Sequence, residues 1–160
     1  MELVILVGLP DSGKSTFFRD RFAATHVLVS KDLLKNNRQP ARRQHELIEQ
    51  ALGQDRSVVV DNTNPRRTDR AGLIELARRH GARVTGYVFT SGAADCLARN
   101  RQREGKARVP AVAIYTAARR MEPPRREEGF DLLYCVDVAP PSGFTVTEWA
   151  PAAGGLPLTT

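Results

Sequence analysis

Short apolar runs alternate with longer segments of helical hydrophobic periodicity along most of the chain. The first run, residues 3–7, has no polar position, which is typical of a strand buried on both faces of a sheet. Further apolar runs predict strands at residues 27–29, 57–60, 83–89 and 131–136. The segments between them predict helices at residues 14–24, 40–53, 65–80, 93–103 and 110–121. This alternation predicts an α/β fold, with about five parallel strands and helices on both faces of the sheet.

Residues with known positional preferences mark the expected ends of these helices. Pro40 is expected to open the second helix, and Asn64 and Pro65 are expected to be the N-cap and first residue of the third. Gly81 is expected to end that third helix. The polar segment 33–39 remains ambiguous.

The chain has 160 residues, which fits one domain, and the alternating pattern covers residues 1–138. Residues 139–160 form a tail rich in proline, glycine and alanine, which we expect to add one strand around residues 144–149 and then fray. Cys96 and Cys135 lie far apart, without a C-x-x-C pattern. Because neither a secretory leader nor a membrane-spanning apolar run is found, we expect a cytoplasmic protein that does not enter membranes.

The segment that follows the first strand has the phosphate-binding pattern G-x-x-x-x-G-K-S of a P-loop. Its glycines allow backbone N–H groups to surround an anion, and the next helix directs its free N–H groups at the same point. Lys14 is expected to lie along the β- and γ-phosphates of ATP, Ser15 to coordinate Mg²⁺ and Thr16 to support the first helical turn. The pattern therefore predicts a P-loop NTPase fold that uses ATP and Mg²⁺. The expected nucleotide-binding residues of the loop are Gly8, Pro10, Asp11, Ser12, Gly13, Lys14, Ser15 and Thr16.

One of these positions is unusual, because Asp11 places a carboxylate in a loop that binds anions. It should weaken phosphate binding unless its side chain points outward or pairs with a basic neighbour.

Ligands of such sheets bind outside the carboxyl ends of the strands, so acids at strand ends are candidates for chemistry. Asp32 follows the second strand, where a carboxylate near the γ-phosphate could accept the proton of an acceptor hydroxyl. A plain structural role is equally compatible with the sequence, since Asp32 could be the N-cap of the turn at residues 33–34.

Asp61 ends a buried strand, as a Walker-B-like acid does. Such an acid either holds the Mg²⁺ shell or orients a basic side chain in the acceptor site, and we favour one of these functions over a role in the turn. Asn62, Thr63 and Asn64 follow it, and for Asn64 we favour turn and capping hydrogen bonds.

Arg99 and Arg103 are four residues apart and would share one face of a helix, where like charges repel unless an anion lies between them. Arginines on a mobile segment that closes over ATP would neutralise charge in the transition state. A solvated basic face is the alternative. The net charge of +6 suits an anionic partner such as nucleic acid, but all except four of the 24 basic residues are arginine, a bias that base composition alone can produce.

Six segments have the order and spacing found in polynucleotide 5′-hydroxyl kinases. The chain resembles the kinase half of the eukaryotic polynucleotide kinase-phosphatases and is also similar to the phage polynucleotide kinase, over roughly residues 3–138. The segments are residues 8–16, 60–65, 87–90, 99–104, 109–110 and 128–130.

The resemblance implies a P-loop kinase domain with an arginine-bearing lid. By the same resemblance, Asp32 is the general base, Lys14, Ser15 and Arg103 contact the phosphates with Arg99 less certain, and Asp61 belongs to the acceptor site. Either Lys35 or Arg38 would contact a phosphate of the acceptor. The sequence departs from the family pattern in having Ser30-Lys31-Asp32 where Asn-Arg-Asp is usual, and Asp11 where glycine is usual.

We therefore expect an enzyme that transfers the γ-phosphoryl group of ATP to the 5′-hydroxyl end of DNA or RNA. No acidic phosphatase motif is present, so a 3′-phosphatase or ligase partner would be a separate protein. Two alternatives share the P-loop. One is a small-molecule kinase acting on a sugar, an antibiotic or a nucleotide sugar, and the other is a binding module in which the P-loop acts as a switch.

Overall fold

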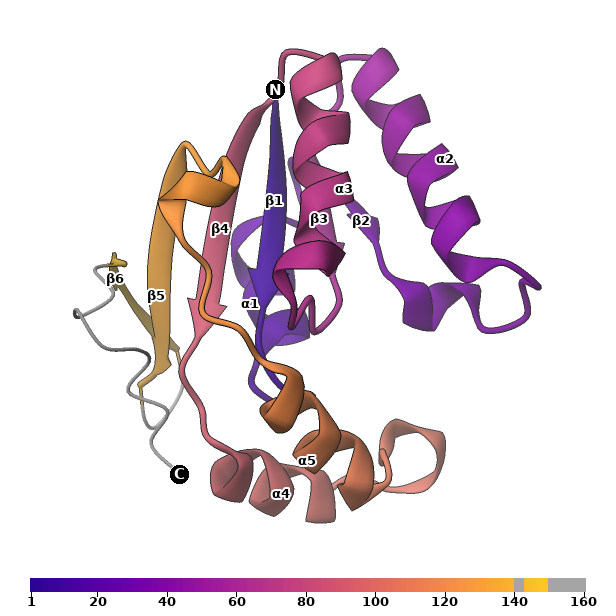
Figure 1. Ribbon diagram of the computed structural model, residues 1–160. Helices are drawn as coiled ribbons and strands as arrows, with labels where there is room; N and C mark the ends of the chain where they lie inside the picture. Colours follow the sequence, from indigo (N-terminus) through magenta and orange to yellow (C-terminus); the bar gives the residue numbers. More distant parts are fainter. Residues whose placement is uncertain (140–142, 150–160) are drawn as a thin grey trace.

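The strand β1 (Glu2–Val7) lies at the centre of a six-stranded sheet with the order β2-β3-β1-β4-β5-β6 (Figure 1). The computed structural model describes residues 1–139 and 143–149 of the chain. Its other strands are β2 (Val27–Val29), β3 (Val58–Asp61), β4 (Arg83–Phe89), β5 (Leu132–Val138) and β6 (Phe144–Glu148). The strands β1 to β5 run parallel, which confirms the predicted five-stranded core, and β6 adds to its edge antiparallel to β5.

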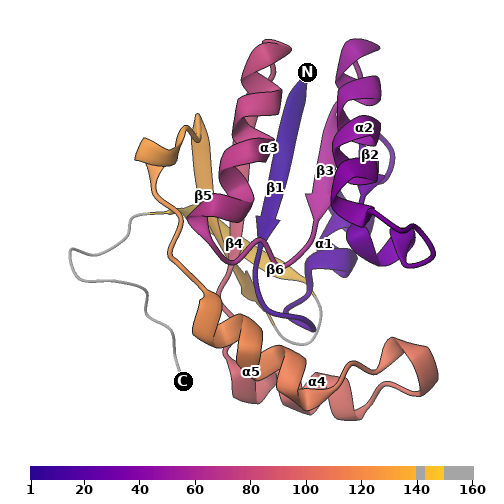
Figure 2. The same cartoon turned by 45° about the vertical axis from the view of Figure 1, so that its right-hand side comes forward.

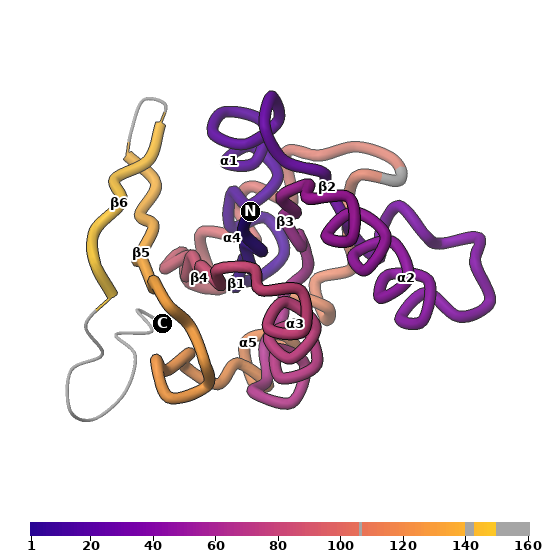
Figure 3. Tube along the Cα trace, turned by 90° about the horizontal axis from the view of Figure 1, so that it is seen from above, coloured from indigo at the N-terminus to yellow at the C-terminus, as the bar shows by residue number. Residues whose placement is uncertain are grey.

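Helices cover both faces of this sheet, as Figure 3 shows from above. The helices are α1 (Lys14–Arg21), α2 (Pro40–Gly53), α3 (Arg67–Arg79), α4 (Ala93–Arg101) and α5 (Ala111–Arg120), with short 3₁₀ turns η1 (Lys31–Leu34), η2 (Gly105–Ala107) and η3 (Arg126–Glu128). Alternate β1 side chains explain the layering. Leu3, Ile5 and Val7 pack with α2 and α3 on one face, whereas Val4 and Leu6 pack with the phenylalanines of α1 on the other.

The helices α4 and α5 cover neither face but pack against each other beyond the carboxyl ends of the strands (Figures 1 and 2). Their small apolar cluster joins Cys96 and Ile114 to Leu9 of the P-loop. The pair therefore closes over the edge at which an α/β sheet binds its ligands. No helix in the described residues is long and apolar enough to span a membrane.

The predicted start of α3 was wrong by two residues. Asn64 has a positive φ of 45°, Pro65 lies in the loop, and the helix begins at Arg67. The Asn64 side chain does not cap the helix, because its buried amide donates instead to the carbonyl oxygen of Leu6 at 2.8 Å. A tertiary contact with the end of β1 thus replaces the expected local cap.

A buried ion pair fixes the loop between β3 and α3. Arg70 of α3 and Glu128 of η3 are almost fully buried, and two nitrogens of Arg70 bind the carboxylate at 2.9 and 3.1 Å. The third nitrogen donates to the carbonyl oxygens of Asn64 and Pro65 at 2.9 and 3.1 Å. Because this loop carries the residues that follow Asp61, the ion pair positions one wall of the candidate site.

The strand β6 also supports the site, through its first residue. The Phe144 ring packs edge-to-face against Phe17 of α1, with centroids 5.2 Å apart. A Cβ atom on residue 13 would lie 3.0 Å from the same ring, so Gly13, with φ of 101°, leaves space for it. The strand that the sequence predicted near residues 144–149 therefore backs the P-loop, whereas the frayed end expected after it lies outside the described residues.

Candidate active site

A cleft of about 880 Å³ opens at the carboxyl ends of the strands, between the P-loop and the α4–α5 pair. The predicted site residues that line it are Pro10, Asp11, Gly13, Lys14, Ser15, Thr16, Asp32, Lys35, Asp61 and Arg103. Of the remaining predicted residues, Ser12 is buried within the loop, and Gly8 packs so closely that a Cβ atom would lie 2.8 Å from Phe89. Arg38 is exposed and is not among the residues that line the cleft.

Lys14 is held in place by the P-loop itself. Its ammonium group is buried and donates to the carbonyl oxygens of Gly8 and Leu9 at 3.0 and 2.7 Å. Burial lowers the pKa of Lys14 from its ordinary value, and the nearby carboxylates of Asp61, Asp32 and Asp11 partly offset this shift. The three acids thus lie close enough to Lys14 to influence its pKa.

Asp61 contacts the residue that was expected to bind the metal. The Ser15 hydroxyl donates to Asp61 Oδ2 at 2.8 Å, and the Asp61 side chain is buried at the end of β3. A hydroxyl and a carboxylate are the oxygen donors that Mg²⁺ prefers when it is also bound by phosphate oxygens and water. The pair therefore fits a magnesium site of the P-loop type, and it favours the first of the two functions considered for Asp61.

Asp32 lies on the 3₁₀ turn η1, across the cleft from the lid. Ser30, and not Asp32, caps this turn, because the Ser30 hydroxyl accepts a hydrogen bond from the backbone N–H of Asp32 at 3.2 Å. The capping role that the sequence left open is therefore wrong. The Asp32 carboxylate is exposed to the cleft, which leaves it accessible to a substrate.

The β3–α3 loop holds η1 in place through Asn62. Its side-chain oxygen accepts from the backbone N–H of Lys31 at 2.9 Å, and its amide donates to Gln44 of α2 at 2.7 Å. The segment before Asp32 is thus connected to the segment after Asp61.

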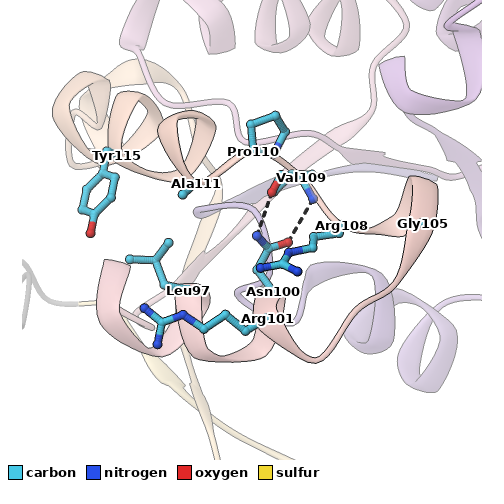
Figure 4. Close-up of a pocket in the computed structure, with 9 residues that line it drawn as sticks. All are labelled: Leu97, Asn100, Arg101, Gly105, Arg108, Val109, Pro110, Ala111 and Tyr115. Carbon is cyan, nitrogen blue, oxygen red and sulfur yellow. Dashed lines mark hydrogen bonds between the residues drawn. The ribbon is translucent and has the colours of Figure 1, made fainter.

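The lid is the segment 99–109, from the end of α4 to the start of α5. Asn100 closes it by two hydrogen bonds to the backbone of Val109, donated at 2.7 Å and accepted at 2.9 Å (Figure 4). A shallow pocket of about 430 Å³ lies on its outer side and shares only Val109 with the lining of the cleft. Arg103 lines the cleft, and its Nε contacts Asp11 Oδ1 at 2.6 Å. Arg99 is not among the residues that line the cleft, but it donates to the Asp11 carbonyl oxygen at 2.9 Å.

Several basic side chains of the cleft were not predicted from the sequence. Arg66 follows the β3–α3 loop and Arg120 lies in the last turn of α5, and both line the cleft together with Arg19 and Lys31. A signal for Arg66 existed, since it follows directly after the strand-end motif at residues 61–65. Arg120 had none, because it belongs to a cleft wall only when α5 folds back over the sheet.

The strand order, the nucleotide-binding P-loop between β1 and α1, and the helical lid together define a P-loop kinase fold. Within this class, the chain belongs to the AAA domain family, whose model matches residues 3–124.

The relatives include kinases with different acceptors. The chain is similar to a bifunctional polynucleotide phosphatase/kinase from Schizosaccharomyces pombe, with 30% identity over 135 residues that cover 81% of this chain and 32% of the relative. It is similar to an L-seryl-tRNA(Sec) kinase from Methanococcus maripaludis, with 27% identity over 81% of this chain and 56% of the relative. The chain thus spans about a third of the length of the first relative and slightly more than half of the second. Among solved structures, a gluconokinase from Sinorhizobium meliloti 1021 superposes with a TM-score of 0.61 and 23% identity, over 88% of this chain and 84% of that one.

Proposed function

We propose that this chain is an ATP-dependent kinase that transfers the γ-phosphoryl group of ATP to the 5′-hydroxyl end of DNA or RNA. The observation that carries the proposal is the charge of the cleft. Seven basic side chains and four carboxylates line it, and five of the cations lie outside the P-loop and its lid: Arg19, Lys31, Lys35, Arg66 and Arg120. An acceptor that carries phosphodiester groups would use these cations, whereas an uncharged alcohol would not.

The proposed roles follow from the positions of the side chains. Lys14 and Arg103 bind phosphate oxygens of ATP, and Asp32 accepts the proton of the acceptor hydroxyl as the oxygen attacks. Ser15 and Asp61 would hold Mg²⁺, which when bound would neutralise negative charge on the phosphates of ATP. Asn62 and Ser30 orient the turn that carries Asp32, so the base stays at the side of the cleft where an acceptor enters.

The acceptor-phosphate contact, which the sequence left between two residues, is proposed to be Lys35. It lines the cleft three residues after Asp32, whereas Arg38 does not line it. The 30% identity with a polynucleotide phosphatase/kinase supports a polynucleotide acceptor, and a cytoplasmic location would agree with that substrate.

A small-molecule kinase is the second candidate. The similarity to a gluconokinase structure and the compact size of the cleft favour it, since 880 Å³ is within the range of sites that enclose a small ligand. The hydroxyl of a sugar would be placed beside Asp32 in the same manner.

A direct comparison of acceptors tests the proposal. The protein is incubated with γ-labelled ATP and Mg²⁺, and with a 5′-hydroxyl oligonucleotide, the same oligonucleotide bearing a 5′-phosphate, or a panel of sugars and nucleosides. We expect label on the 5′-hydroxyl oligonucleotide alone, and none with Lys14→Ala. Label on a sugar, with none on the oligonucleotide, would establish the second candidate instead.

A further inference from the structure

Asp11 is buried against the lid, although it belongs to a loop that binds anions. Its side chain is only 3% exposed, and Arg103 Nε contacts its Oδ1 atom at 2.6 Å. Arg99 donates to the Asp11 carbonyl oxygen at 2.9 Å and to the Ser91 hydroxyl at 3.1 Å. Both lid arginines therefore bind the same P-loop residue, one through its side chain and the other through its backbone.

Two features make an aspartate unfavourable at this position. Its φ is 63°, in the left-handed region, where glycine is most easily accommodated and aspartate is tolerated. Its Oδ2 atom is buried and has no hydrogen-bond partner among the described residues. A strained residue with an incompletely satisfied carboxylate at a phosphate site calls for a functional explanation.

The geometry of Arg103 suggests that explanation. The guanidinium uses Nε for Asp11, and its side chain is half exposed to the cleft. The two terminal nitrogens make no hydrogen bond to any residue in the described part of the chain, so their N–H groups remain available for phosphate oxygens. Arginine on a surface loop samples many rotamers, and the contact with Asp11 restricts them before a substrate arrives.

We propose that Asp11 is a positioning residue, which holds Arg103 over the P-loop so that its free nitrogens meet the γ-phosphoryl group during transfer. This inference rests on the proposed kinase activity. Asp11 acts through Arg103 and makes no contact with the reacting atoms. Its carboxylate also repels the phosphates of bound ATP, so the benefit of the pair belongs to the transition state and not to ATP binding.

Steady-state kinetics of Asp11→Asn, Arg103→Lys and the double variant test the proposal. We expect Asp11→Asn to lower kcat by about 10- to 100-fold and to change the KM for ATP by less than about threefold. The double variant should be no slower than Arg103→Lys by more than about twofold, because the two residues act as one unit.

Two matched controls exclude general effects of these substitutions. Asp55 has a comparable φ of 57° and lies exposed just before β3, at the amino end of that strand and not at its carboxyl end. Asp55→Asn therefore changes the same residue type in the same backbone conformation. Arg101→Lys changes an exposed arginine on the outer side of the lid. Both should keep the kcat of the unmodified protein. An unchanged or higher kcat in Asp11→Asn with tighter ATP binding, or fully additive effects in the double variant, would overturn the proposal.

Limited trypsin digestion without nucleotide separates this inference from the proposed function. The lid carries several arginine cleavage sites, so loss of the Asp11 contact should speed cleavage within residues 99–108 at least threefold in Asp11→Asn, but not in Asp55→Asn. If Asp11→Asn is cleaved faster but the unmodified protein phosphorylates no acceptor, the proposed function is wrong, whereas the docking of the lid by Asp11 is supported. If the unmodified protein transfers phosphate and Asp11→Asn has the same cleavage rate and the same kcat, the inference about Asp11 is wrong and the proposed function stands.

Discussion

At the scale of single residues, the cleft brings three carboxylates together around one buried lysine. Lys14 is buried beside three carboxylates, and each carboxylate has a distinct environment: Asp61 accepts from Ser15, Asp11 binds Arg103, and Asp32 faces the cleft. Different environments allow groups of the same chemistry to perform different tasks. Of these three carboxylates only that of Asp32 is exposed, so a substrate hydroxyl can reach it.

Replacing Asp32 by asparagine should therefore impair transfer and spare ATP binding. Asparagine keeps the size of the side chain and removes its basicity, so we expect transfer to fall at least 100-fold while the affinity for ATP changes less than threefold. Titration with a fluorescent ATP analogue measures the second quantity. Asp20→Asn, an exposed acid on α1, is the matched control. A parallel loss of ATP affinity in Asp32→Asn would make this residue structural.

The reactivity of the Cys96 thiol reports whether α4 and α5, the helices on either side of the lid, stay packed together. Cys96 belongs to α4 and is fully buried in the cluster that α4 and α5 form with Leu9, and burial raises the pKa of its thiol to about 11. At pH 8, a rise of about two units leaves roughly one hundredth of the usual thiolate. We expect a thiol reagent to modify Cys96 in the folded protein at least 100-fold more slowly than in urea. Rapid reaction of Cys96 in the folded state, identified by mass spectrometry, would show that the lid opens freely.

At the scale of elements, the site depends on contacts between segments that are far apart in the sequence. Arg70 and Glu128 are 58 residues apart, and together they attach α3, η3 and the β3–α3 loop to one another. Their charges are fully paired, so the arrangement tolerates burial that either group alone would not. The ion pair thus fixes the loop that follows Asp61, although neither Arg70 nor Glu128 lines the cleft.

Removing one partner of this pair should cost much of the stability of the fold. We expect Glu128→Ala to lower the free energy of unfolding by about 3 to 5 kcal/mol, because it leaves a buried guanidinium uncompensated. Urea denaturation followed by circular dichroism measures this change. The adjacent exposed Glu127→Ala should change stability by less than about 0.5 kcal/mol. Similar values for the two variants would contradict the importance assigned to the pair.

At the scale of the whole molecule, the excess of positive charge is useful only if it lies where the partner binds. Arg66 and Arg120 line the cleft, whereas Arg79 lies exposed at the other end of α3. Binding of a polynucleotide through its phosphates depends on salt in proportion to the number of contacts.

Neutralising a cleft arginine should therefore change the salt dependence of oligonucleotide binding. We expect Arg66→Gln and Arg120→Gln each to reduce the slope of log Kd against log salt by about 0.7, the contribution of one phosphate contact on a single strand. Fluorescence anisotropy with a labelled oligonucleotide measures the slope, and Arg79→Gln should leave it unchanged. Equal slopes for all four proteins would place the oligonucleotide elsewhere.

The parts of the fold that could be predicted are those encoded locally. The apolar run of β1 and the G-x-x-x-x-G-K-S motif located the sheet and the P-loop, and the strand-end rule located Asp32 and Asp61 at the cleft. The contact of Asp11 with Arg103 joins residues 92 positions apart, and the Asn64 amide reaches β1 across 58 positions. Such contacts depend on how the elements pack, and no local pattern reports them.

The support that Phe144 gives to Gly13 has a practical consequence for anyone who shortens this protein. A fragment ending at residue 138 would retain all the polar groups of the cleft, but it would lose the aromatic ring behind the phosphate loop and the Trp149 indole, which donates to the Pro124 carbonyl oxygen at 3.0 Å. The smallest piece worth expressing therefore extends through Trp149, because the last strand belongs to the folded unit that carries the P-loop.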